Sequence, residues 1–324
     1  MRIGNIQIER GVLLAPMEDV TDLPFRVLCK RQGADLVYTE FVNARELIHG
    51  NPRMRRKLLF LEEERPVGIQ IYGGEPDEMA PAARVAATFG PDLLDINCGC
   101  WVKDIAGRGA GAGLLRDLSR MQELIAAVVA ATSLPVTVKT RLGWDAGSIR
   151  IVDVARMCEA SGVAALTVHC RTRDQGHAGA VNYDWIPRIK EAVDLPIIVN
   201  GDVASPEDAA RVFDLTQCDA VMIGRAALRN PRIFRETKHY LATGNRLPPL
   251  EPAERLQLLR EHLDLAVKHL GEKEAVAELR RHYATLLIGM RDVQAIRDEL
   301  RRAADPGTIL EQIGRRLDLF APAG

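Results

Sequence analysis

The chain has 324 residues, a formal net charge of −1 and an apolar fraction of 47%, an ordinary composition for a globular protein. Its length accommodates one β/α barrel of about 250 residues and a small additional domain, and its near-zero charge gives no compositional sign of a nucleic-acid partner. No run approaches the ~20 apolar residues of a membrane span, and the first ten residues lack the apolar core of a signal peptide, so we expect a cytoplasmic protein with no membrane partner.

Eight short apolar runs recur along the chain with helical patterns between them, and the alternation predicts parallel βαβ units. The runs are Val12–Ala15, Leu36–Thr39, Gly68–Ile71, Leu94–Asn97, Val136–Thr140, Leu166–His169, Ile197–Asn200 and Ala220–Ile223. Eight such units favour a closed (β/α)8 TIM barrel. The alternative is an open doubly wound sheet, but the early Gly-x-Gly-x-x-Gly turn typical of that fold is absent.

The strand pattern stops after Tyr240, and the proline-rich segment 245–252 is typical of a linker. Three amphipathic helical patterns follow, at Leu256–Leu270, Ala275–Ile288 and Ile309–Leu319. We therefore predict a barrel domain over residues 1–244 and a C-terminal all-helical domain over residues 245–324.

Polar residues follow the predicted strands, at the end of a β/α barrel that faces the active site. Gln70 and Lys139 are expected to point into the centre of the barrel. The loops after the last two strands often bind phosphate, and here they read Asn200-Gly-Asp202 and Gly224-Arg225. A flat cofactor with a phosphate tail, such as FMN, fits this layout.

The fourth strand ends in Asn97-Cys-Gly-Cys100 and leads into a glycine-rich loop. A thiol placed there can serve as nucleophile, metal ligand or proton donor. No cysteine or histidine cluster has zinc spacing, so we expect no metal. Cys98 is expected to pack in the core, and His262 and His282 to be surface or core residues of the terminal helices.

Seven motifs in order resemble those of the tRNA-dihydrouridine synthase family, especially its bacterial B-type branch. They are Ala15-Pro-Met17 with Thr21-Asp-x-Pro-Phe-Arg26, Asp95-Ile-Asn-x-Gly-Cys100, Val138-Lys-x-Arg-x-Gly-Trp144, Leu166-Thr-x-His-x-Arg-Thr172, Asn200-Gly-Asp202, Met222-Ile-Gly-Arg-Ala226 and Ile233-Phe-Arg235. The match runs from Met1 to about Pro249 and more loosely through the terminal helices.

The resemblance implies reduction of the C5–C6 bond of specific uridines in tRNA, with FMN as cofactor and NADPH as reductant. Cys100 corresponds to the cysteine that protonates C5 while reduced flavin delivers a hydride to C6. The FMN-binding positions correspond to Pro16, Met17, Glu18, Gln70, Lys139, His169, Asn200, Gly201, Asp202, Gly224 and Arg225. The substrate-binding positions correspond to Asn97, Arg141, Arg171 and His177.

The resemblance also implies a monomer whose terminal helices bind tRNA. We expect basic residues of the barrel rim and of these helices to form one continuous positive surface. They are Lys103, Arg108, Arg141, Arg171 and Arg173 on the rim, and Arg280, Arg281, Arg291, Arg297, Arg301 and Arg302 on the helices.

Trp101 departs from the family pattern, because relatives usually have proline directly after the cysteine. Its indole is expected to pack the loop down or to stack near the substrate. Two alternative functions remain at this point. One is the same chemistry on rRNA, and the other is a small-molecule FMN oxidoreductase of the ene-reductase or dihydropyrimidine type. The terminal helices argue against the second, since a small substrate needs no additional platform.

Overall fold

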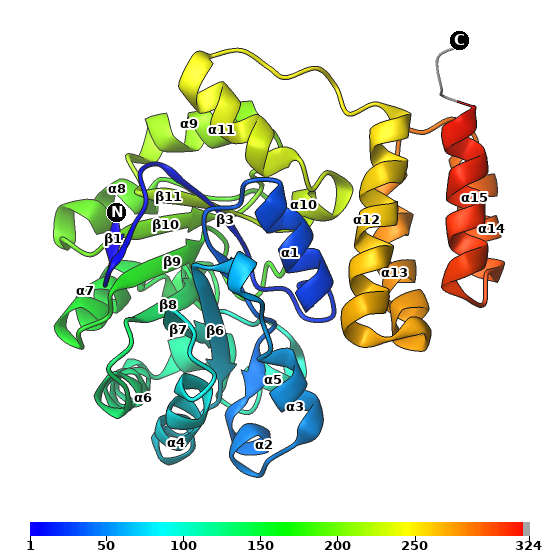
Figure 1. The fold of residues 1–324 in the computed structure, drawn as a ribbon. Helices are drawn as coiled ribbons and strands as arrows, with labels where there is room; N and C mark the ends of the chain where they lie inside the picture. The colour runs from blue at the N-terminus through cyan, green and yellow to red at the C-terminus, as the bar shows by residue number, and fades with distance from the viewer. Residues whose placement is uncertain (320–324) are drawn as a thin grey trace.

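The computed structural model describes residues 1–319 and contains a parallel β/α barrel with a group of helices beside it (Figure 1). The barrel strands are β3 (Gly11–Leu14), β4 (Val37–Tyr38), β6 (Val67–Tyr72), β7 (Leu93–Cys98), β8 (Val136–Arg141), β9 (Ala165–His169), β10 (Ile197–Asn200) and β11 (Ala220–Ile223). Each agrees with one of the eight predicted runs to within one residue at either end. The predicted TIM-barrel fold is therefore confirmed.

The strands are hydrogen-bonded in the order β3-β11-β10-β9-β8-β7-β6-β4, and β5 (Val42–Asn43) also pairs with β6. Backbone hydrogen bonds from Leu14 to Leu36 and from Asp35 to Val12, each 3.0 Å long, join β3 to the β4 segment and close the ring. The register places Asn97 beside Lys139 on the neighbouring strand. Polar strand ends that are far apart in sequence therefore meet at one rim.

Helices surround the barrel, and several begin at the signals that the sequence contains. Asp22 and Ser205 cap α1 and α9 by accepting hydrogen bonds from the backbone of Phe25 and Asp208, and a proline follows each cap. The helices of this ring are α1 (Leu23–Arg31), α2 (Ala44–Ile48), α3 (Pro52–Lys57), α4 (Pro76–Ala87), α5 (Lys103–Ala106), α6 (Leu118–Ala131), α7 (Ile151–Ala160), α8 (Trp185–Ala192), α9 (Pro206–Thr216), α10 (Arg225–Arg229) and α11 (Ile233–Thr243).

The amino-terminal end of the barrel is filled with apolar side chains. Leu13, Tyr38, Leu93 and Ile198 form this cluster together with Ile3 of the hairpin β1 (Arg2–Ile3) and β2 (Ile6–Gln7). All five are completely buried. A ligand must therefore enter from the opposite end, where the strands finish.

Four helices follow the barrel: α12 (Pro252–Leu270), α13 (Glu272–Leu286), α14 (Val293–Arg302) and α15 (Pro306–Asp318). They stand on one side of the barrel (Figure 1), where α12 packs on α1 and α13 packs on α10. The sequence predicted only three of them, because α14 is mostly polar and buries little besides Ile296 and Leu300. No helix within residues 1–319 combines the length and apolar character that crossing a bilayer requires.

Candidate active site

A cavity of about 910 Å³ opens at the carboxyl ends of the barrel strands. This volume is within the range of small-molecule and cofactor sites. Every residue predicted for the site except Arg171 lines it. The lining residues from that prediction are Pro16, Met17, Glu18, Gln70, Asn97, Cys100, Lys139, Arg141, His169, His177, Asn200, Gly201, Asp202, Gly224 and Arg225.

A buried chain of hydrogen bonds forms the wall of this cavity on β6, β7 and β8. Thr137 Oγ1 donates to Asp95 Oδ1 (2.5 Å), and Gln70 Nε2 donates to Asp95 Oδ2 (2.6 Å). Asn97 Nδ2 in turn donates to Gln70 Oε1 (3.0 Å). Burial raises the pKa of Asp95 to about 6. The chain of bonds fixes which end of each amide faces the cavity, and Asp95 at its centre was not predicted as a site residue.

Asn97 holds the backbone that carries Cys100. Its Oδ1 accepts hydrogen bonds from the N–H groups of Gly99 (3.0 Å) and Cys100 (2.9 Å). The Asn97 carbonyl is therefore already used by the loop, and the side chain has one amide N–H left for a ligand. The Cys100 side chain is half-buried, and burial raises the pKa of its thiol above the ordinary value. The thiol is therefore protonated at neutral pH.

Arg141 ties the Cys100 loop to the loop that follows β9. Its Nε donates to Gly99 O (2.8 Å), and its Nη1 donates to Thr172 O (3.0 Å) and Gly176 O (2.8 Å). The side chain is only 2% exposed, and burial lowers the pKa of Arg141 to about 10. The guanidinium is still charged at neutral pH, so it supplies both a fixed cation and a clamp between two loops.

Trp101 and His177 form a pair at the mouth of the cavity. The indole Nε1 donates to His177 Nε2 (3.2 Å), and the two rings meet edge to face with centroids 5.4 Å apart. Because Nε2 accepts this bond, the neutral imidazole carries its proton on Nδ1. Burial and the neighbouring arginines lower the pKa of His177 to about 4, so the ring is neutral at pH 7. Trp101 is 40% exposed, so part of it is accessible at the entrance.

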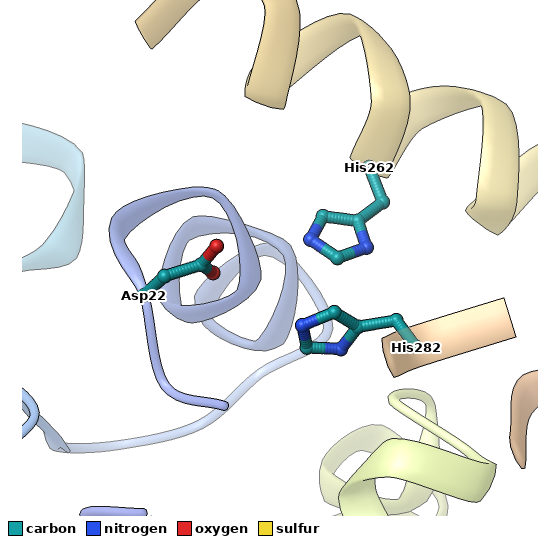
Figure 2. Close-up of side chains that lie close together, drawn as sticks. All are labelled: Asp22, His262 and His282. Carbon is teal, nitrogen blue, oxygen red and sulfur yellow. The ribbon is translucent and has the colours of Figure 1, made fainter. Parts of the chain in front are cut away.

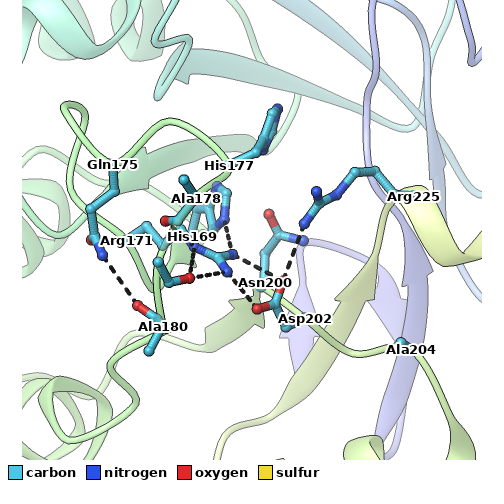
Figure 3. A network of polar contacts seen from close by, with 12 residues as sticks. His169, Arg171, Gln175, His177, Ala178, Ala180, Asn200, Asp202, Ala204 and Arg225 are labelled. Atoms are coloured by element: carbon cyan, nitrogen blue, oxygen red, sulfur yellow. Dashed lines mark hydrogen bonds and ion pairs between the residues drawn. The ribbon is translucent and has the colours of Figure 1, made fainter.

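Asp202 accepts hydrogen bonds from two arginines at the ends of β9 and β11 (Figure 3). Arg171 binds it with both terminal nitrogens (3.0 and 2.5 Å), and Arg225 Nη2 binds it at 3.2 Å. Arg171 is 3% exposed and also donates to the carbonyl of Gly179 (2.6 Å), so its guanidinium lies behind Asp202 rather than on the cavity wall. Its hydrogen bonds hold the pKa of Asp202 below the ordinary value. The assignment of Arg171 to substrate stays a prediction, and the contacts favour a positioning role.

Gly201 lies between Asn200 and Asp202 with a φ of +131°. A Cβ on this residue would lie 2.9 Å from the Val181 side chain, so no other residue fits without displacement. Asn200 Nδ2 donates to Met222 O (2.8 Å) and joins the ends of β10 and β11. The backbone of these two loops can therefore approach a ligand closely.

Two of the basic residues predicted for a continuous positive surface, Arg141 and Arg171, are buried and so cannot contribute to it. Arg280 and Arg297 donate to backbone carbonyls of the terminal helices, and a continuous surface formed by the remaining residues stays a prediction. Arg255 of α12, which was not predicted, lines the cavity and donates to Leu286 O (3.0 Å). No local pattern marks Arg255, because its position depends on how α12 packs against the barrel.

The fold and the site together define a β/α-barrel protein with a cofactor-sized cavity that carries cationic side chains and a protonated thiol at its rim. The profile of the family described as dihydrouridine synthase (Dus) matches residues 13–318. The chain belongs to this family.

Relatives match along most of their length. The tRNA-dihydrouridine synthase B of Pseudomonas syringae is 40% identical over 303 residues, which cover 93% of this chain and 90% of the relative. The protein of the same name from Xanthomonas campestris is 43% identical over 282 residues, 87% of this chain and 85% of the relative. That of Shewanella oneidensis is 38% identical, and the match covers 96% of this chain and 97% of the relative.

Solved structures share the fold at much lower identity. The old yellow enzyme homologue from Zymomonas mobilis has a TM-score of 0.55 and 13% identity, covering 78% of this chain and 94% of that one. A morphinone reductase variant in complex with tetrahydroNAD has a TM-score of 0.58 and 12% identity, covering 78% and 92%. At these identities the likeness concerns the barrel fold alone.

Proposed function

We propose that this chain reduces the C5–C6 double bond of specific uridines in tRNA, with FMN bound in the cavity and NADPH as reductant. The observation that carries the proposal is a protonated thiol, Cys100, at the edge of a cofactor-sized cavity in a member of the dihydrouridine synthase family. The tRNA substrate rests on the names of the relatives, which are tRNA-dihydrouridine synthases B.

The donor groups of the cavity suit FMN. At one end, Gly201 and Gly224 permit close backbone approach, and Arg225 adds a partly exposed cation. The two arginines on Asp202 outnumber its single negative charge, so this end suits a phosphate. At the other end, Gln70 and Lys139 offer polar groups to a flavin ring. When bound there, reduced FMN would supply the hydride that C6 of the uracil accepts.

The protein groups around the uracil complete the reaction. Cys100 donates its proton to C5 as general acid, and the resulting thiolate regains a proton from water because the side chain is partly exposed. The fixed charge of Arg141 stabilises the negative charge that develops on the base. The free amide N–H of Asn97 is available to a uracil carbonyl. These three residues are already held in mutual position by Gly99, whose N–H binds Asn97 and whose carbonyl binds Arg141.

An RNA substrate must present its uridine out of the base stack. Two features of the entrance suit such a substrate. Trp101 is partly exposed there, and the terminal helices contribute Arg255 to the cavity. These features favour a polynucleotide over a free pyrimidine. An rRNA substrate would use the same chemistry, and the experiment below distinguishes it.

The test combines cofactor analysis with product mapping. The cofactor released by acid from the purified protein should elute as FMN in chromatography. An unmodified tRNA transcript, an rRNA fragment and free uridine are then incubated with the enzyme and NADPH, and dihydrouridine is mapped by mass spectrometry. We expect specific uridines of the tRNA to gain two hydrogen atoms each. Release of FAD, or reduction of free uridine as efficient as that of tRNA, would contradict the proposal.

A further inference from the structure

A second group of chemically active side chains lies away from the barrel cavity, where the terminal helices meet the barrel (Figure 2). It consists of Asp22 at the start of α1, His262 on α12 and His282 on α13. One carboxylate oxygen and one nitrogen from each ring lie within 4.8 Å of one another. Figure 2 shows a ring nitrogen of each histidine turned toward the carboxylate. None of the three residues lines the cavity described above.

The facing atoms have no hydrogen-bond partners within residues 1–319. Asp22 Oδ1 accepts the cap hydrogen bond from Phe25 N–H (3.0 Å), but its buried Oδ2 is unpaired. His262 Nε2 and both ring nitrogens of His282 are also buried and unpaired. The two histidines are 1% and 2% exposed. Unpaired buried polar atoms are costly and uncommon, so a cluster with one of them on each of three residues that face one another requires an explanation.

No cation neutralises this cluster within residues 1–319. The guanidinium of Arg26, the nearby cation, is bound by Glu64 at 2.6 Å. A carboxyl oxygen and two imidazole nitrogens, each a possible metal ligand, therefore face one another without a cation between them.

We propose that Asp22, His262 and His282 bind one divalent transition-metal ion, best matched by Zn²⁺, which joins the terminal helices to the barrel. Two imidazole nitrogens and one carboxylate oxygen are a ligand set that Zn²⁺ accepts in tetrahedral sites, where water completes the coordination. Mg²⁺ and Ca²⁺ prefer sites made only of oxygen ligands. The ligands come from α1 on one side and from α12 and α13 on the other, so the ion bridges two parts of the fold.

The three ligand atoms must move closer together to bind one ion. Ligand atoms about 2.0–2.1 Å from a tetrahedral ion lie roughly 3.3 Å apart. The present separations reach up to 4.8 Å, so small rotations of the three side chains are needed to bring them together. The ring of Phe25 packs on both imidazoles, with centroids 5.8 and 4.7 Å away, and shields one side of the cluster from water.

The sequence predicted no metal because that expectation rested on local ligand spacing. Asp22 and His262 are separated by most of the chain, and the two histidines lie on different helices. Only the packing of α12 on α1 brings them to one point.

The experiment uses the tag-free, full-length protein after treatment with a chelator. Co²⁺ is titrated first, and its visible absorption and its stoichiometry by mass spectrometry are recorded; Zn²⁺ is then added. We expect one Co²⁺ per chain with the intense bands of tetrahedral coordination, complete displacement by Zn²⁺, and a rise in Tm of a few degrees with Zn²⁺. A wild-type chain that binds no Co²⁺ or Zn²⁺ at saturating concentration would overturn the proposal.

Matched variants locate the ion. Asp22→Asn keeps an oxygen that can cap α1 but removes the charge, and His282→Gln removes a ring nitrogen; each should weaken Co²⁺ binding at least tenfold. His269→Gln changes another histidine on α12 and should bind as the wild type does. Equal Co²⁺ affinity in Asp22→Asn and the wild type would place the ion elsewhere and refute the site. Circular dichroism and flavin content show whether the variants fold. If the variants do not fold, the Co²⁺ titration of the wild-type protein decides whether the chain binds the metal ion.

Discussion

Arg141→Lys is the sharpest test of the clamp between the Cys100 loop and the loop after β9. The substitution keeps the positive charge but replaces a planar fork with a single ammonium group. Arg141 makes three hydrogen bonds to the carbonyls of Gly99, Thr172 and Gly176 from a position that is 2% exposed. The lysine side chain is shorter and has a single ammonium group, which can replace one of these hydrogen bonds. The other two hydrogen bonds are lost.

The expected loss follows from those two bonds. A hydrogen bond to a charged group contributes about 1.5–3 kcal/mol, so the variant should lose about 3 kcal/mol at the lower limit. If this energy holds the Cys100 loop in its reactive arrangement, the rate of uridine reduction should fall about 100-fold. The flavin content should fall less than the rate, because none of the three carbonyls that Arg141 contacts belongs to the loops Asn200–Asp202 and Gly224–Arg225 at the phosphate end.

The assay is single-turnover reduction of tRNA by the flavin-loaded variant, together with urea unfolding. The matched control is Arg116→Lys, since Arg116 is exposed and its guanidinium lies over the Trp144 ring at 5.0 Å without holding a site loop. The control should react like the wild type. An Arg141→Lys enzyme with wild-type rate and wild-type stability would show that the three hydrogen bonds do not organise the site.

Two further predictions concern the thiol of Cys100 and the cation of Lys139. Cys100→Ala should retain FMN and NADPH oxidation but reduce tRNA about 10²–10⁴-fold more slowly. The control Cys98→Ala, at a fully buried position on β7, should remain active. Equal rates of tRNA reduction in the two variants would show that Cys100 has no part in the mechanism. Burial and the charge of Arg141 lower the pKa of Lys139 to about 8. The cation is therefore lost as pH rises through about 8, and FMN affinity should fall between pH 7 and 9 in the wild type but not in Lys139→Met. Because the pKa of Lys139 is lower in the folded apoprotein, the unfolded apoprotein binds more protons than the folded one above about pH 8. The free energy of unfolding of the apoprotein should therefore rise with pH up to the ordinary lysine pKa of about 10.4. Urea titrations across this range check the sign, and an FMN affinity that is flat with pH in the wild type would show that the Lys139 charge does not contact the cofactor.

The barrel was predictable because its strands are buried on both faces and so appear as short, mainly apolar runs. The last two strands, Ile197–Asn200 and Ala220–Ile223, were predicted at their observed boundaries, and the other six differ by one residue at one or both ends. The helix α14 was missed for the opposite reason. Its sequence is dominated by charged residues, and its apolar stripe consists only of Val293, Ile296 and Leu300, at the helical spacing i, i+3 and i+7. The stripe is present but short, and the sequence-based prediction did not use it.

The site was predictable as a set of positions but not as a set of contacts. A single topological rule, that strand ends face the ligand, places Gln70, Asn97 and Lys139 around one cavity. It does not reveal that the Asn97 carbonyl is occupied by the Cys100 loop, or that Arg171 faces Asp202. Those hydrogen-bond partners depend on how the loops fold back over the rim. The spacing of residues in the sequence identifies neither member of such a pair.

The difference matters most for the cations. Arg141 and Arg171 are the most deeply buried arginines of the rim, and their donors are committed to backbone carbonyls and to Asp202. The other cationic side chains that line the cavity are Lys139, Arg225 and Arg229 of the barrel and Arg255 of α12. We therefore expect the cofactor phosphate at Arg225 and the RNA backbone beside Arg255, where the terminal helices meet the mouth. If Arg255 binds RNA in this way, the attachment of the terminal helices to the barrel is a functional requirement, because the packing of α12 places Arg255 at the cavity.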